Sequence, residues 1–105
     1  EKEIVNETLV AQLNGFDMQY FPSVDALGTL VFTARDKRWG GDEQIMVTAD
    51  SSGFWKTPQL ISSNINSEQN EGTAAISADG KTLVFTGCNR SKGFGSCDLY
   101  ISKNC

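Results

Sequence analysis

A five-residue sequence, TLVFT, occurs twice in the chain, as Thr29–Thr33 and as Thr82–Thr86. The copies lie 53 residues apart, from position 29 to position 82, and each is followed by a basic, glycine-containing loop and a second apolar run, at 45–48 or 99–102. Self-similarity with a period near 50 residues is typical of repeat architectures such as propeller blades. The sequence therefore predicts two copies of one all-β unit.

The first copy contains three runs of β-forming residues between turn signals, which predict strands over 20–24, 29–34 and 44–48. The first two are joined by a turn through Asp25 and Gly28. A fourth strand is expected over Phe54–Leu60, at a sheet edge, because Pro58 cannot donate to a ladder. Glu3–Leu13 alternates loosely and fits an edge strand, with a helix as the alternative.

The second copy repeats this order after a polar connection over 62–72. Strands are expected over 73–77, 82–87 and 97–102, and the turn between the first two carries Asp79-Gly80, where glycine accepts the positive φ of a hairpin. The LVF run of each copy is apolar at successive positions, which is typical of strands buried on both faces. The interpretation is two four-stranded antiparallel propeller blades, over 1–53 and 54–105.

Two blades cannot close a ring, since propellers have typically four to eight. At 105 residues the chain is one domain's worth of sequence. It is therefore expected to be part of a longer propeller or of an oligomeric one.

Two of the three cysteines, Cys88 and Cys97, stand at the facing ends of two strands that are expected to pair. They can face one another across the hairpin, which predicts a disulfide and a location outside the reducing cytosol. Metal binding is the competing interpretation, but the spacing fits no zinc pattern and the chain has no histidine. The third cysteine, Cys105, has three open interpretations: a truncation point, a free thiol or half of an intermolecular bridge.

The stretch SADGKTLVFT (77–86) followed by CDLYIS (97–102) resembles the WD40-like propeller repeat, also called PD40, of TolB-like periplasmic proteins. Together with NEGTAAI (70–76) it is most similar to propeller domains of Bacteroidetes envelope proteins of the OmpA family. The resemblance implies a β-propeller in the periplasm or outside the cell that binds protein or cell-wall partners. The first copy departs from the pattern, with Asp25-Ala26-Leu27-Gly28 in place of the Asp-Gly-Lys order.

Several function classes are disfavoured by composition. A net charge of −4 argues against nucleic-acid binding, and the chain has no long apolar run that could span a membrane. Without histidine, no Ser-His-Asp or Cys-His nucleophile can be built, and the spacing of the carboxylates supports neither glycoside hydrolysis nor a dense calcium loop. We therefore expect no catalytic residues, no cofactor and no metal.

The loops RDKRWGG (35–41) and CNRSKGFGSC (88–97) hold the same position between strands in the two copies, so a propeller would present them side by side on one face. Loops on a rigid sheet commonly carry function, and these hold five of the nine basic residues. The alternative is that the charges are merely solvated and the aromatics pack back over the hairpin. The candidate binding residues are Arg35, Arg38, Trp39, Arg90, Lys92 and Phe94.

The function expected is a non-catalytic propeller module whose partner is a protein, a peptide or a cell-wall glycan. The alternative is the accessory propeller of a hydrolase, a peptidase or glycosidase whose catalytic domain lies outside this chain. A basic rim with aromatic anchors suits an acidic peptide or a stacked sugar ring.

Overall fold

The chain folds into two antiparallel β-sheets in a computed structural model that describes residues 9–51, 54–61, 71–88, 93 and 95–103. The first sheet has the order β1 (Met18–Val24), β2 (Thr29–Arg35), β3 (Glu43–Ser51), and its far edge is formed by β4 (Phe54–Trp55) and β5 (Gln59–Leu60), which both pair with β3. The second sheet has the order β6 (Glu71–Ile76), β7 (Thr82–Cys88), β8 (Cys97–Lys103). The all-β, antiparallel prediction is confirmed.

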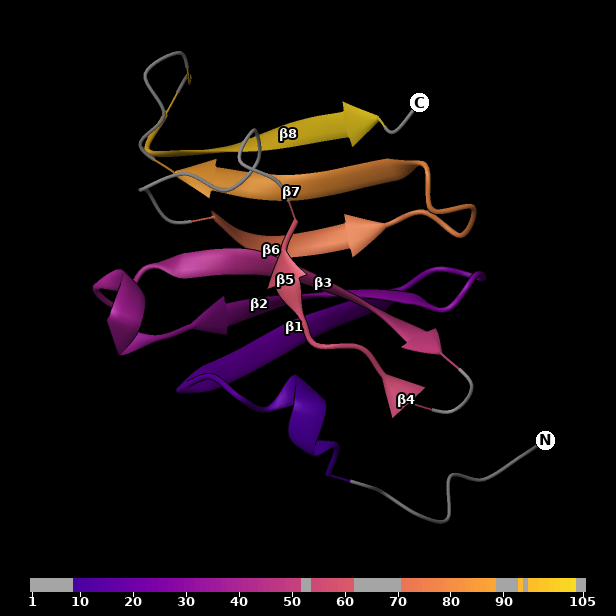
Figure 1. The fold of residues 1–105 in the computed structure, drawn as a ribbon. Helices are drawn as coiled ribbons and strands as arrows, with labels where there is room; N and C mark the ends of the chain where they lie inside the picture. Colours follow the sequence, from indigo (N-terminus) through magenta and orange to yellow (C-terminus); the bar gives the residue numbers. More distant parts are fainter. Residues whose placement is uncertain (1–8, 52–53, 62–70, 89–92, 94, 104–105) are drawn as a thin grey trace, which may run out of the picture.

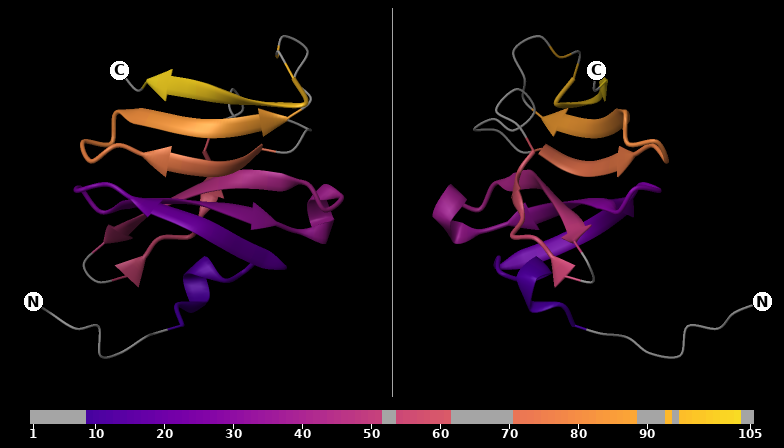
Figure 2. Two further views of the ribbon diagram at one scale, coloured as in Figure 1. Left: turned by 180° about the vertical axis from the view of Figure 1, so that it is seen from behind. Right: turned by 45° about the vertical axis from the view of Figure 1, so that its right-hand side comes forward.

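The two sheets are stacked, with β6 nearest the first sheet and β8 farthest from it (Figure 1). β6 lies across β1, β2 and β3, and the views in Figure 2 show the same arrangement. Hydrogen bonds also join the two units: the backbone N–H of Thr73 donates to Thr33 Oγ1 at 3.1 Å, and that of Ile76 donates to Ser23 Oγ at 3.1 Å. Between the two hairpin turns, the backbone N–H of Ala26 donates to the carbonyl of Ala78 at 2.8 Å. The layers are therefore linked by polar contacts as well as by the core.

The two TLVFT runs form β2 and β7, the central strands of their three-stranded units. Each is preceded by a turn that contains a glycine with positive φ, 91° at Gly28 and 76° at Gly80, a conformation that costs glycine little. Asp25 stabilises the first turn, since its Oδ1 accepts from the backbone N–H of Leu27 at 2.9 Å and of Thr29 at 2.8 Å. The backbone N–H of Thr29 is the main cause that lowers the pKa of Asp25. The predicted turns are confirmed in both copies.

A β-bulge recurs at the same place in both sheets. In the first sheet Tyr20 pairs with Thr33 but Ser23 pairs with Val31, which leaves one extra residue on β1. In the second sheet the same shift falls between Gly72 and Ala74 of β6. A residue in the bulge of each strand has positive φ, 55° at Phe21 and 48° at Thr73. The bulge is a shared feature of the repeat that the sequence pattern did not indicate.

The core is split by the first sheet into two clusters. Between the sheets lie the buried side chains of Val31, Ile45, Ala74, Leu83 and Phe85. On the other face of the first sheet lie the buried side chains of Leu30, Phe32, Ala34 and Met46, covered by Leu13, Phe16, Trp39 and Trp55. Both faces of β2 are therefore buried, as its LVF run predicted.

The prediction that both faces are buried is wrong for the second LVF run. Along β7, Leu83 and Phe85 are buried, whereas Val84 between them is only half-buried. Alternate side chains of a strand point to opposite faces, and only one face of the second sheet meets the first sheet. The apolar residues on both faces of β7 are therefore buried on one face only.

Two predicted strands also differ from the structure. Of the expected edge strand Glu3–Leu13, residues 1–8 lie outside the described residues and Ala11–Leu13 forms a 3-10 helix. The expected strand Phe54–Leu60 is divided into β4 and β5, because Pro58 has no N–H and the chain leaves the ladder around it. Both pieces pair with β3, so this stretch completes the first sheet, and the described part of the second sheet has three strands.

Candidate functional site

Three of the predicted binding residues lie at the end of β2 (Arg35) and in the connection from β2 to β3 (Arg38 and Trp39). This connection contains a 3-10 helix, Lys37–Trp39, which is capped by Asp36: the carboxylate Oδ1 accepts from the backbone N–H of Arg38 at 2.9 Å. The helix ends at Gly40, whose φ of 71° is left-handed. Aspartate before a helix and glycine after it are the ordinary start and stop residues. The connection is therefore a structured platform rather than an open loop.

Arg38 is held by a two-pronged ion pair. Its Nε donates to Asp36 Oδ1 at 2.8 Å and its Nη2 donates to Asp36 Oδ2 at 2.8 Å. The guanidinium also lies over the ring of Phe16, 5.7 Å from the centroid, in a cation–π contact. Hydrogen bonds from the Arg38 side chain hold the pKa of Asp36 well below its usual range. The Arg38 side chain stays 63% exposed, so a preoriented cation faces solvent.

Trp39 does not project as a loop tip. Its ring centroid lies 5.4 Å from that of Phe16, and the side chain packs against the buried residues on the outer face of the first sheet. For Trp39 the structure favours the alternative in which the aromatic ring packs back over the hairpin. It is half-buried, so part of its surface is still exposed.

Arg35 is the last residue of β2, and its side chain lies beside the carboxylate of Glu43, which also accepts a hydrogen bond from Tyr20 of β1. Its Nη2 lies 3.8 Å from Glu43 Oε1, and the phenol of Tyr20 donates a short hydrogen bond to Glu43 Oε2. Burial, and then the hydrogen bond to this carboxylate, raise the pKa of Tyr20. The Arg35 side chain is 43% exposed. The sequence indicated Arg35 but gave no reason to place Tyr20 and Glu43 next to it.

The connection between β7 and β8 holds the other three predicted binding residues, Arg90, Lys92 and Phe94, which lie outside the described residues. Its base is closed by Cys88 and Cys97, whose sulfur atoms are 2.07 Å apart in a disulfide, and these residues face each other in the ladder. The backbone N–H of Gly95 donates to Asp98 Oδ1 at 3.1 Å. The predicted disulfide is thereby confirmed.

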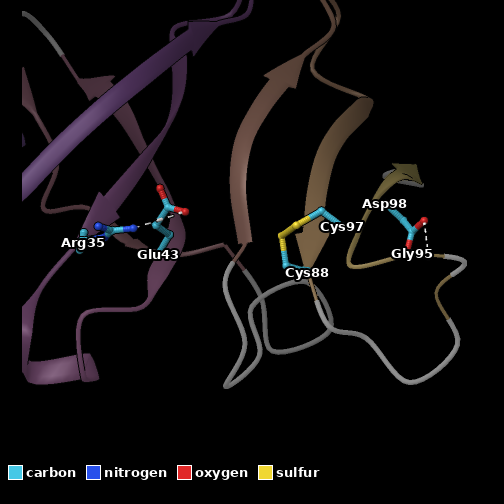
Figure 3. Close-up of a disulfide and its surroundings, with 6 residues drawn as sticks. All are labelled: Arg35, Glu43, Cys88, Gly95, Cys97 and Asp98. Atoms are coloured by element: carbon cyan, nitrogen blue, oxygen red, sulfur yellow. Dashed lines mark hydrogen bonds and ion pairs between the residues drawn. A yellow bond between two sulfur atoms is a disulfide. The ribbon is translucent and has the colours of Figure 1, made fainter.

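Figure 3 shows the Arg35–Glu43 pair and the Cys88–Cys97 disulfide at the same end of the two stacked sheets. The structure therefore brings the bases of both connections to one end, as expected from their matching places in the repeat. Within the described residues, no group of three or more histidine, cysteine, aspartate or glutamate side chains could hold a metal ion. In the same part of the chain, no helix has the length and apolar character needed to cross a membrane.

A hollow of about 190 Å³ lies beside β1 and was not indicated by the sequence. Its lining combines apolar side chains with the polar groups of Asn14, before β1, and of Gln19 and Tyr20, in β1, and none of the predicted binding residues lines it. The lining residues are Leu13, Asn14, Gln19, Tyr20, Pro22, Leu30 and Phe32.

Comparison of the chain with protein-family models, with curated proteins and with solved structures found no significant match. The geometry of the sheets and their connections is therefore the basis for the function proposed below.

Proposed function

We propose that this chain is a non-catalytic binding module, built from two blades of a larger or oligomeric β-propeller, that contacts an acidic protein, peptide or glycan partner. The observation that carries this proposal is that the bases of the two connections lie at one end of the stack and that this end of the first sheet carries two guanidinium groups held by ion pairs. Arg35 and Arg38 are both substantially exposed, and their positions are set by Glu43 and Asp36. Asp36 occupies the Nε and Nη2 donors of Arg38, so this guanidinium offers a partner its positive charge and its remaining N–H donors, which attract carboxylate and sulfate groups.

The charge arrangement supports binding rather than catalysis. An arginine remains protonated at all physiological pH values, so it cannot exchange protons as an acid or base. Asp36 has a lowered pKa because it is committed to Arg38, and it is suited to holding a side chain in place rather than to accepting a proton. We therefore assign these groups to electrostatic recognition.

The disulfide supports a place outside the reducing cytosol, since such bonds persist mainly in oxidising compartments. We propose the periplasm or the cell exterior as the location. The partner would then be an envelope protein or a cell-wall glycan.

The test compares two variants that remove the same charge. The loop variant carries Arg35→Gln, Arg90→Gln and Lys92→Gln, and the control variant carries Lys56→Gln, Lys81→Gln and Lys103→Gln. Arg38 is kept in both, because its loss would leave the nearly buried carboxylate of Asp36 without its cation. Each protein is passed over immobilised oligoglutamate at increasing salt.

The loop variant should elute at distinctly lower salt than the unchanged chain, because association through exposed charges is screened by ions. The control variant should elute much closer to the unchanged chain. Equal losses in the two variants would show that retention follows total charge and not the proposed surface. The same pair of variants can then be used in pull-downs from an envelope extract.

A further inference from the structure

The connection that leads into β1 contains the only Asn-Gly step of the chain, Asn14-Gly15. Asn14 follows the 3-10 helix Ala11–Leu13, and its side-chain Nδ2 donates to the carbonyl of Val10 at 2.8 Å. Both Asn14 and Gly15 are exposed. The Asn14 side chain is therefore held at the surface by one exposed hydrogen bond.

Gly15 offers a backbone nitrogen that is accessible and unpaired. Glycine has no side chain to shield this nitrogen, and even a Cβ at Gly15 would meet nothing within 4 Å. In the part of the chain that the structure describes, the N–H of Gly15 donates no hydrogen bond. A nucleophilic nitrogen and an exposed side-chain amide are thus adjacent in the sequence, with little around them to keep them apart.

The Asp79-Gly80 step in the turn between β6 and β7 shows the opposite arrangement. The N–H of Gly80 donates to the carbonyl of Ser77 at 2.9 Å. Asp79 Oδ1 accepts from the hydroxyl of Ser77 at 2.6 Å and from the backbone N–H of Lys81 at 3.0 Å. Both the nitrogen and the carboxylate of this step are held by hydrogen bonds, so the two Gly-containing steps should differ in reactivity.

We propose that Asn14 is a site of spontaneous covalent modification, at which its side-chain amide is converted to a carboxylate. The backbone nitrogen of Gly15 forms a bond to Asn14 Cγ, the Cγ–Nδ2 bond breaks, and Nδ2 leaves as ammonia with the amide proton of Gly15. Water then opens the five-membered ring. Opening at Cγ gives aspartate, and opening at the backbone carbonyl carbon of Asn14 gives isoaspartate, in which the main chain runs through Cβ and Cγ. The sequence of steps needs only water and involves no oxidation or reduction.

The modification should loosen the side chains that cover the first sheet on the side facing away from the second. A carboxylate accepts hydrogen bonds but cannot donate one to the carbonyl of Val10, and isoaspartate also lengthens the main chain by one carbon. Leu13 and Phe16, on either side of the Asn14-Gly15 step, pack against the buried cluster of this side. Asn14 also lines the hollow beside β1, which would gain a negative charge. This inference does not depend on the basic connections.

The test is peptide mapping by mass spectrometry of the purified chain, sampled at intervals during incubation in mildly alkaline buffer. The peptide that contains Asn14 should gain about 1 Da, and part of it should become a substrate for methylation by an isoaspartyl methyltransferase. The peptide that contains Asp79 should acquire far less isoaspartate. The matched variant Gly15→Ala keeps Asn14 and adds a methyl group that meets nothing within 4 Å, so it should fold and gain mass several-fold more slowly, because the methyl group hinders the attacking nitrogen.

A second measurement tests the effect on the fold. Asn14→Asp is a fixed copy of one product and should melt at a lower temperature than the unchanged chain. The control Gln59→Glu makes the same change of amide to carboxylate at an exposed residue of β5 and should melt close to the unchanged chain. An Asn14 peptide that keeps its mass, a gain that is equally fast in Gly15→Ala, or as much isoaspartate at Asp79 as at Asn14 would overturn the proposed site. Equal melting temperatures for Asn14→Asp and Gln59→Glu would overturn the proposed loosening.

Discussion

Equivalent positions in the two sheets should differ sharply in their contribution to stability. Ile45 in β3 and Leu99 in β8 occupy the same place in the repeat, but Ile45 has no exposed surface and Leu99 is 76% exposed. Truncating Ile45 to alanine removes roughly three carbons at about 0.8 kcal/mol each, or about 2.4 kcal/mol. The cavity left between the sheets raises the loss of unfolding free energy to about 3–4 kcal/mol.

The corresponding change in the second sheet should cost little. About a quarter of the Leu99 side chain is covered, so Leu99→Ala should lower the free energy of unfolding by only about 0.6 kcal/mol. Urea denaturation followed by tryptophan fluorescence measures both variants. If Ile45→Ala does not fold, the pair Ile45→Val and Leu99→Val makes the same comparison, with about 0.5–1.5 kcal/mol expected for the buried position. Equal losses at the two positions would refute the stacking described here.

Three smaller changes test other parts of the fold. Reduction of the Cys88–Cys97 disulfide should lower the free energy of unfolding by about 2–3 kcal/mol, because the disulfide closes a short loop and so restricts the unfolded chain. Urea titration with and without reductant measures this loss. Gly80→Ala should lower the free energy of unfolding by more than about 1 kcal/mol, because the φ of Gly80 is 76° and a Cβ there would lie 2.6 Å from Asp25 Oδ2. Gly15→Ala is the control: a Cβ at Gly15 would have nothing within 4 Å, so the loss in the same titration should be much smaller. The free energy of unfolding should fall as the pH drops below about 4, because the pKa of Asp36 is lower in the folded chain than in the unfolded one. In thermal melts, the melting temperature of Asp36→Asn should depend less on pH in that range than the melting temperature of the unchanged chain.

The repeated TLVFT run was sufficient to predict the centre of each sheet. Strand propensity and apolar character placed β2 and β7, and the turn residues Gly28 and Gly80 placed the hairpins that lead into them. The disulfide followed from the same pairing, because residues at facing ends of adjacent strands must be close.

Features that depend on packing between the sheets could not be predicted in this way. Phe21 and Thr73 in the two bulges have positive φ, although neither residue type favours it, and the backbone N–H of Thr73 donates to Thr33 of the other sheet. Ala11–Leu13 ends a stretch whose composition fits a strand, but these three residues form a 3-10 turn, and Leu13 packs against the side of the first sheet that faces away from the second. Tertiary contacts therefore overrode local propensity at these positions.

The candidate site was predicted in part. Charge and loop position indicated Arg35 and Arg38, but the partner of Arg38 could have been found only from the capping position of Asp36. Whether Trp39 points outward or packs inward depends on Phe16, which is distant in sequence and whose position no local pattern gives.

The central claim is that the second sheet covers one particular face of the first sheet. Methyl and aromatic nuclear Overhauser contacts in the intact chain test it directly, because a one-residue slip in strand register would exchange the two faces. The structure predicts contacts from Val31 and Ile45 to the methyl groups of Ala74 and Leu83 and to the ring of Phe85. Contacts from Leu30 and Met46 to these same groups, in place of Val31 and Ile45, would contradict it.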